Sequence, residues 1–181
     1  VTGGAGYIGS VATALLLEAG YEVTVLDDLS TGHEDSVPTS VKFVKGSLLN
    51  DEDLDTALTN CEAVMHFAAK SLVGESVEKP DLYNRVNVGG SKALLAKMKE
   101  HEIEKLVFSS TAATYGEPKK VPISESDATA PKNPYGESKL AVDNMIAASG
   151  FSAISLRYFN VAGAYKGANG WLSERHNPET H

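Results

Sequence analysis

The sequence predicts an α/β fold, in which a doubly wound parallel sheet carries helices on both faces. Short apolar runs of strand length alternate along the chain with amphipathic stretches of helix length, and this alternation is typical of βαβ units. Most of the short runs are apolar on both faces, as buried parallel strands require. A glycine-rich turn opens the chain, where such folds place the first turn from strand to helix.

Five runs have the length and the β-branched or apolar composition of strands. They cover residues 22–27, 41–45, 63–67, 105–109 and 153–158. Only Val1 and Thr2 precede the glycine run, so we expect them to be the end of a truncated first strand. They should pair in parallel between the first and third of the five runs.

Four helices are expected between the strands. They cover Tyr7–Ala19, Asp51–Leu58, approximately Leu82–Glu100, and Tyr135–Ala148. Gly20 and Ser149-Gly150 follow the first and last of these as helix stops, and Asn133-Pro134 provides an N-cap and a first helical residue. The segment 110–133 is long and irregular, which favours a functional loop.

Composition excludes several classes of protein. The 181 residues suit one domain, and 42% hydrophobic and 22% charged residues are typical of a globular chain. A net charge of −8 argues against a nucleic-acid partner, and no apolar run is long enough for a membrane span. The single cysteine, Cys61, fits a reducing cytoplasm. The five histidines have no metal-ligand spacing, so no metal site is expected, and His66 should pack inside its strand.

The glycine run and a later aspartate together predict a dinucleotide site. Gly4, Gly6 and Gly9 read as G-x-G-x-x-G, which lets a backbone approach a pyrophosphate at a helix N-terminus. Alone, this pattern is also compatible with a simple glycine-rich turn. Asp27 ends the next strand at the distance expected of a ribose-binding acid, although a solvated turn aspartate is the alternative. The segment DLSTG that ends at Gly32 offers no cation for a 2′-phosphate, so NAD is favoured over NADP.

A tyrosine and a lysine four residues apart predict a general base. Tyr135 and Lys139 share one face of the last helix, and a neighbouring ammonium would lower the pKa of the phenol. Hydroxyls at Ser109, Ser110 and Thr111 end the preceding strand at the ligand-binding edge of such sheets. An ordinary surface pair and serine-rich turn chemistry are the alternatives for these features.

Six segments together resemble the extended short-chain dehydrogenase/reductase family, and within it the enzymes that epimerise UDP-hexoses. They are TGGAGYIG, LDDLSTG, HFAAKSLVGESVEKP, FSSTAATYGEP, NPYGESK and LRYFNVAGA, in the order and spacing of that family. The resemblance implies a Rossmann-type NAD-binding domain. It also implies epimerisation at C4 of a UDP-hexose, UDP-galactose to UDP-glucose, through a 4-keto sugar with Tyr135 as the base.

The resemblance also assigns residues. It implies catalytic roles for Thr111, Tyr135 and Lys139, and substrate contacts for Thr111, Tyr135 and Asn160. The implied NAD contacts are Gly3, Gly6, Tyr7, Ile8, Gly9, Asp27, Phe67, Ala68, Ala69, Asn87, Ser109, Tyr135, Lys139 and Tyr158.

Two departures from the family pattern stand out. Ser47 replaces an aspartate that contacts adenine in the family, which would weaken cofactor binding. The resemblance covers only the amino-terminal half of the family, so residues 1–181 are expected to be a partial NAD-binding domain without the substrate domain. The intact protein is expected to be a cytoplasmic homodimer of galactose metabolism.

Three alternatives remain open at this point. A 4,6-dehydratase is disfavoured, because Ala112 and Ala113 stand where dehydratases carry an acid pair. A nucleotide-sugar decarboxylase or reductase of the same family, and a non-catalytic NAD-binding domain, both remain possible from the sequence.

Overall fold

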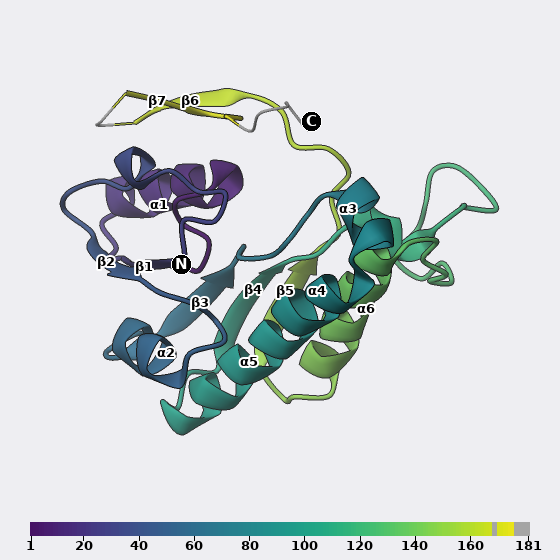
Figure 1. Cartoon of the computed structure of the whole chain (residues 1–181), viewed down its shortest axis with the longest axis horizontal. Helices are drawn as coiled ribbons and strands as arrows, with labels where there is room; N and C mark the ends of the chain where they lie inside the picture. The colour runs from purple at the N-terminus through teal and green to yellow at the C-terminus, as the bar shows by residue number, and fades with distance from the viewer. Residues whose placement is uncertain (168–169, 176–181) are drawn as a thin grey trace.

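The computed structural model describes residues 1–167 and 170–175, and it contains the parallel sheet that the sequence predicts (Figure 1). All pairings within this sheet are parallel, and Thr2 bridges β1 to β3, so the spatial order is β2, β1, Thr2, β3, β4, β5. The strands are β1 Thr24–Asp27, β2 Lys42–Lys45, β3 Ala63–His66, β4 Lys105–Ser109 and β5 Ser152–Leu156. Because the first strand in the chain is central and later strands extend outward on both sides, the sheet is doubly wound.

Val1 and Thr2 occupy the central position expected of them. The Thr2 N–H donates to the Met65 carbonyl at 2.9 Å, and the Thr2 carbonyl accepts from the Phe67 N–H at 3.0 Å. On the other side, the Leu26 N–H donates to the Val1 carbonyl at 2.9 Å. These bonds confirm the predicted parallel pairing on both sides of this short segment.

Helices lie on both faces of the sheet. Figure 1 shows α1 (Tyr7–Glu18) on one side, and α2 (Asp51–Leu58), α5 (Gly90–Glu100) and α6 (Pro134–Ala147) on the other. Between the second group and the sheet lies the main core, which includes Leu54, Leu94, Met98, Phe108 and Val142, all of them nearly fully buried. Burial of such side chains is the main term that stabilises the fold.

Local sequence signals account for the helix ends. The Asn133 side chain accepts the Gly136 N–H at 2.8 Å and caps α6, whose first residue is Pro134, as predicted. Gly20 follows α1 with a φ of +85°, which confirms its role as a helix stop. None of the helices among the described residues is long and apolar enough to cross a membrane.

The helix expected over approximately 82–100 is confirmed in extent, but its middle is not a regular α-helix. It consists of α4 (Pro80–Tyr83), a π-helical turn η2 (Asn84–Gly89) and α5, and a separate helix, α3 (Val73–Glu78), which was not predicted, precedes it. Pro80 has no N–H to donate to a preceding turn, so α3 stops before it and α4 starts on it. The π-helical turn widens the helix directly before α5.

The remaining elements were not predicted from the sequence. Two short 3₁₀ helices, η1 (Glu34–Ser36) and η3 (Ala112–Tyr115), lie in the loops after β1 and β4. An antiparallel pair, β6 (Ala164–Gly167) and β7 (Gly170–Ser173), follows β5 and packs near α1 (Figure 1). The strand expected over 153–158 ends earlier, at Leu156, so Tyr158 lies beyond the sheet edge.

Candidate functional site

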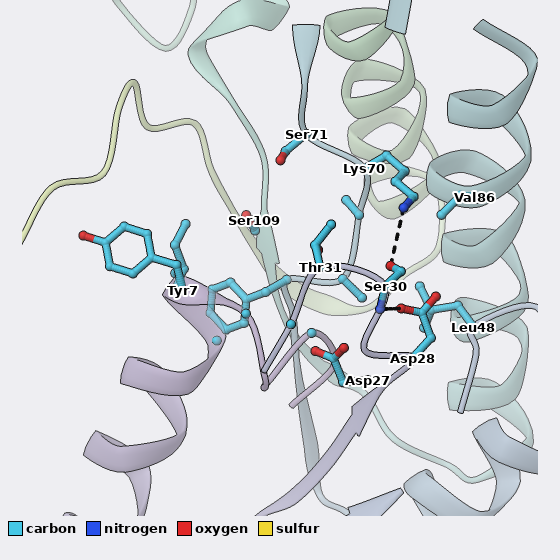
Figure 2. A pocket seen from close by; sticks show the side chains of 18 of the residues that line it. Tyr7, Asp27, Asp28, Ser30, Thr31, Leu48, Lys70, Ser71, Val86 and Ser109 are labelled. Carbon is cyan, nitrogen blue, oxygen red and sulfur yellow. Dashed lines mark hydrogen bonds between the residues drawn. The ribbon is translucent and has the colours of Figure 1, made fainter. Parts of the chain in front are cut away.

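A cavity of about 420 Å³ follows the carboxyl edge of the sheet. Its walls come from the glycine loop before α1 and from the segments that follow β1, β2, β3, β4 and β5. Figure 2 shows Tyr7 on one side of this cavity and Asp27, Asp28 and Leu48 on the other. The edge where parallel strands end is the usual ligand site of a doubly wound sheet.

The glycine loop is shaped by close backbone contacts that exclude side chains. A Cβ on Gly9 would lie 2.1 Å from the Gly3 carbonyl oxygen, and one on Gly3 would lie 2.5 Å from the Ala68 nitrogen. Gly3 also has a φ of +72°, a conformation that favours glycine. These positions therefore require glycine for the loop itself, before any ligand is considered.

The N-terminus of α1 borders the cavity, since Gly6, Tyr7 and Ile8 line it. Its N-cap residue is Gly6, which has no side chain to cap the helix, and the first turn carries no acidic residue. The backbone N–H groups at the start of a helix and the positive end of its dipole favour a phosphate at such a position. The loop therefore fits the pyrophosphate of a dinucleotide.

Asp27 lies at the end of β1 on the cavity wall and is mostly buried. Its Oδ2 accepts the Ala5 N–H at 2.9 Å, and its Oδ1 accepts the Leu29 N–H at 2.9 Å. Burial raises the pKa of this carboxyl, and the two backbone N–H groups oppose that rise. Asp27 thus fixes the glycine loop as well as facing the cavity, and sequence reasoning missed this structural role.

The predicted Tyr135–Lys139 pair lies on α6 and lines the same cavity as Asp27, which ends β1. The Lys139 Nζ is buried, donates to the Ser109 carbonyl at 2.7 Å, and lies 6.0 Å from the centre of the Tyr135 ring. Burial lowers the pKa of Lys139 to about 8, and the carboxylate of Asp143 opposes this shift. A lysine with this pKa can change charge near neutral pH.

The expected lowering of the Tyr135 pKa by Lys139 is not found. Burial raises the pKa of this phenol, with a further rise from Tyr158, while a hydrogen bond with Thr111 lowers it. The Lys139 ammonium donates to the Ser109 carbonyl and makes no hydrogen bond with the Tyr135 hydroxyl among the described residues. Thr111 is therefore the residue that favours the phenolate in this structure.

Hydroxyl groups connect β4 to the segment after β5. The Ser109 and Tyr158 hydroxyls are hydrogen-bonded to each other, and both residues line the cavity. Thr111 caps η3 by accepting the Ala113 N–H at 3.2 Å, which fixes its side chain at the end of β4. The serine- and threonine-rich strand end is thus built into the site.

Most of the predicted site residues come together on the cavity wall. They are Gly3, Gly6, Tyr7, Ile8, Gly9, Asp27, Phe67, Ala68, Ala69, Ser109, Thr111, Tyr135, Lys139 and Tyr158.

Two predicted contact residues do not line the cavity. Asn87 is buried behind the wall, where its side chain accepts the Lys70 N–H at 2.8 Å and donates to the Lys70 carbonyl at 3.0 Å and to the Ser138 hydroxyl at 3.0 Å. All of its hydrogen bonds are thus with the protein, so it joins the loop after β3 to α6 instead of facing a ligand. Asn160 is exposed and lies outside the cavity lining, although its neighbours Phe159 and Val161 belong to it.

Some lining residues carried no signal in the sequence. Lys70, after β3, extends its Nζ to within 3.4 Å of the Ser30 hydroxyl in the loop after β1 (Figure 2). Because these segments are 40 residues apart, no local motif could reveal that a cation lies beside DLSTG. Ser47 lines the cavity after β2, as its family position suggests, and its backbone N–H is held by Asp53 at 2.8 Å.

Among the described residues, no group of three or more His, Cys, Asp or Glu side chains is arranged to hold a metal ion. His66 packs within β3 as predicted, bonded to the Thr2 hydroxyl at 2.7 Å and the Ser91 hydroxyl at 2.9 Å. Burial lowers the pKa of His66 to about 3, so its ring is neutral at ordinary pH. His176 and His181 lie outside the described residues.

The fold and the cavity define a dinucleotide-binding protein of the Rossmann type. The sequence matches the NAD dependent epimerase/dehydratase family over residues 1–176, and the chain belongs to this family. It is 52% identical, over 100% of its length, to the UDP-glucose 4-epimerase of Halalkalibacterium halodurans, and 51% identical to that of Corynebacterium glutamicum. The chain covers 55% of each of these proteins, so it spans about half the length of the curated relatives it matches.

Solved structures agree with this assignment. The UDP-glucose 4-epimerase from Brucella ovis in complex with NAD superposes with a TM-score of 0.93 at 45% identity, over 99% of this chain and 56% of that one. The Thermotoga maritima enzyme with UDP-glucose superposes with a TM-score of 0.87 at 34% identity, over 95% of this chain and 58% of that one. These likenesses support the fold and the family.

Proposed function

We propose that the protein containing this chain is an NAD-dependent epimerase that interconverts UDP-galactose and UDP-glucose. One observation carries the proposal: Thr111, Tyr135 and Lys139 line the same cavity as the glycine loop and Asp27. A proton-transfer group and a pyrophosphate cradle in one cavity are what a hydride-transferring enzyme requires. The UDP-glucose 4-epimerases to which the chain is similar support the substrate class.

The cavity residues fit NAD as the resident cofactor. The N-terminus of α1 would hold the pyrophosphate, and the Asp27 carboxylate retains lone pairs that can accept ribose hydroxyls beside its two backbone bonds. Phe67, Ala68 and Ala69 line the wall after β3, along the expected path of the cofactor. Bound NAD would accept a hydride from the sugar and return it to the opposite face.

Tyr135 is proposed as the proton-transfer residue. Its phenolate oxygen would take the proton of the sugar 4-hydroxyl while the C4 hydrogen leaves as hydride, and the resulting hydroxyl would give the proton back when hydride returns to the 4-keto sugar. The Thr111 hydrogen bond favours the phenolate, and Lys139 would hold the nicotinamide ribose. Asn160 is proposed as a substrate contact, which requires that a substrate extend beyond the cavity as it is lined here.

The competing reactions lack equivalent support. Ala112 and Ala113 follow Thr111, so the chain offers no carboxylate there for the elimination that a dehydratase performs. A nucleotide-sugar decarboxylase or reductase would use the same Tyr135 and Lys139, and a non-catalytic NAD-binding protein would use only the glycine loop and Asp27. Product analysis separates all of these functions.

Larger-scale properties are proposed on the same basis. Residues 1–181 would form part of the NAD-binding domain. The part of the intact protein that corresponds to the unmatched part of the relatives would form a substrate domain. Because α5 and α6 lie together on one face of the sheet (Figure 1), that face is proposed to pair two subunits as a four-helix bundle in a homodimer. A cytoplasmic role in galactose metabolism follows from the proposed reaction.

The test is to incubate the purified, NAD-loaded protein with UDP-galactose and separate the nucleotide sugars. The proposal requires UDP-glucose as the product and no net formation of NADH. A 4-keto-6-deoxy sugar would instead indicate a dehydratase, and an oxidised sugar with net NADH would indicate the reverse of a reductase. A decarboxylase would release CO₂ and a pentose only from a UDP-uronic acid, which is supplied in a parallel reaction. Tight NAD binding without any product would favour the non-catalytic function.

A further inference from the structure

Asp143 is a buried carboxylate to which the proposed reaction gives no role. It lies on α6, one helical turn after Lys139, and its side chain is 4% exposed. Its Oδ2 accepts the Ser110 hydroxyl at 3.0 Å and the Arg157 Nε at 2.9 Å. Its Oδ1 is buried and has no hydrogen-bond partner among the described residues.

The contacts of Asp143 converge on the elements that carry the site. Ser110 stands between Ser109, whose carbonyl holds Lys139, and Thr111. Arg157 directly precedes Tyr158, and its guanidinium donates to the Tyr115 hydroxyl at 3.0 Å and lies 5.1 Å from that ring. One carboxylate thus connects α6 to the ends of β4 and β5.

We propose that Asp143 is a positioning residue for the reaction, which holds Lys139 in its charged form and fixes the strand ends that carry Thr111 and Tyr158. This inference rests on the proposed function, because it assigns Asp143 to the same site. Asp143 touches neither substrate nor cofactor in this scheme and acts through its neighbours. A buried carboxylate with one unpaired oxygen is costly for stability alone, which favours a role beyond packing.

Among the neighbours of Lys139, Asp143 is the carboxylate whose negative charge favours the protonated form of the lysine. Tyr135 and Asp143 face it from α6 and His66 from β3, while Arg157 faces Asp143. Tyr158, after β5, is hydrogen-bonded to Ser109, whose carbonyl holds Lys139. His66 is neutral at ordinary pH, and Asp143 is the neighbour that raises the pKa of Lys139 against the effect of burial. Removing that charge should make Lys139 lose its proton at lower pH.

The test compares Asp143→Asn with Asp55→Asn in the full-length protein. The first substitution keeps the shape of the side chain and removes its charge. The second removes a carboxylate from a partly buried cluster with Lys97 and His101, outside the cavity lining, and serves as a matched control. Two quantities are measured: the alkaline limb of kcat/KM for UDP-galactose, and the pKa of Lys139 from a ¹³Cε-lysine NMR titration assigned with Lys139→Met.

For Asp143→Asn, both the alkaline limb and the Lys139 titration should move down by about one pH unit, the lower end of the range for a neighbouring charge. Asp143→Glu, which restores the charge, should bring both back toward wild type, and Asp55→Asn should move neither. An unchanged Lys139 titration in folded Asp143→Asn, or a rate that falls equally at every pH, would overturn the inference.

A second variant covers the case in which Asp143→Asn does not fold. Arg157→Gln removes the cation that offsets Asp143, so the Lys139 titration should move up instead of down, and no upward movement would equally overturn the inference. The NMR titration needs no catalysis. If wild-type protein does not convert UDP-galactose, the proposed function fails while the link between Asp143 and Lys139 is still measured.

Discussion

The packing of the glycine loop can be tested by replacing Gly9 or Gly6 with alanine, because the added methyl group would clash at Gly9 and fit at Gly6. In Gly9→Ala the new Cβ would lie 2.1 Å from the Gly3 carbonyl oxygen, whereas real Cβ contacts are essentially never under 3.0 Å. The two groups must therefore separate by at least about 0.9 Å. Gly3 cannot easily move, since its N–H donates to the Leu26 carbonyl at 2.8 Å and its φ is +72°.

In Gly6→Ala, by contrast, the new Cβ would lie 3.4 Å from the same oxygen, an ordinary contact at a φ of −80°. Forced overpacking costs about 3 kcal/mol, so Gly9→Ala should lower the melting temperature by roughly 6–12 °C. Gly6→Ala should leave the melting temperature within about 2 °C of wild type. It should nevertheless weaken NAD binding at least about tenfold, because its methyl group enters the cavity where the pyrophosphate would lie.

Thermal denaturation followed by circular dichroism and NAD titration by calorimetry measure the two effects separately. Gly74→Ala is the control, because its methyl group would meet nothing within 4 Å and the residue lies in α3, outside the cavity. A Gly9→Ala protein with wild-type stability and wild-type NAD affinity would refute the close-packing argument. Gly6→Ala with unchanged NAD affinity would refute the position assigned to the pyrophosphate.

Three further predictions concern single side chains. Tyr135→Phe should lower the rate of epimerisation by a factor of about 10² to 10⁴ and change NAD affinity little, as measured by product assay and calorimetry; a rate within about twofold of wild type would exclude Tyr135 as the base. Asp27→Asn has only one acceptor oxygen for the Ala5 and Leu29 N–H groups, so NAD affinity should fall at least about tenfold; equal affinity in a titration would remove Asp27 from the ribose site. His66 has a folded pKa of about 3 against 6.5 when unfolded, so the unfolded state binds more protons and stability falls as the pH drops from 6.5 toward 3. Between pH 7 and pH 5 this loss should be about 2 kcal/mol in urea denaturation, and His66→Gln should lack it; an equal loss in both proteins would contradict the burial argument.

The local parts of the fold could be predicted from the sequence. Short apolar runs and helical patterns, together with Asn133-Pro134 and Gly20, predict strands and helix ends because each depends on neighbours in the chain. The central pairing of Thr2 followed from the order of strands in doubly wound sheets. The short helix α3 and the π-helical turn η2 were missed, because a six-residue segment carries too little pattern to distinguish these conformations from a loop or an α-helix.

The misses arise from contacts between distant segments. The spacing of motifs could not place Asn87 or Lys70. The Asn87 side chain binds the backbone of Lys70, 17 residues away in the sequence, and the Lys70 side chain contacts Ser30, 40 residues away. The pKa of Tyr135 was predicted in the wrong direction, since the spacing to Lys139 reveals neither burial nor the Ser109 carbonyl that takes the ammonium. Motif spacing thus located the site, and its electrostatics required the fold.

The central claim is that hydride leaves C4 of a UDP-hexose and returns to the same carbon while Tyr135 moves the proton. The most direct measurement is to convert UDP-galactose carrying deuterium at C4, with NAD-loaded protein, and to analyse the product by NMR and mass spectrometry. The account predicts UDP-glucose that retains the deuterium at C4, with no net NADH. Deuterium lost to solvent, or no UDP-glucose from protein that demonstrably binds NAD, would contradict it.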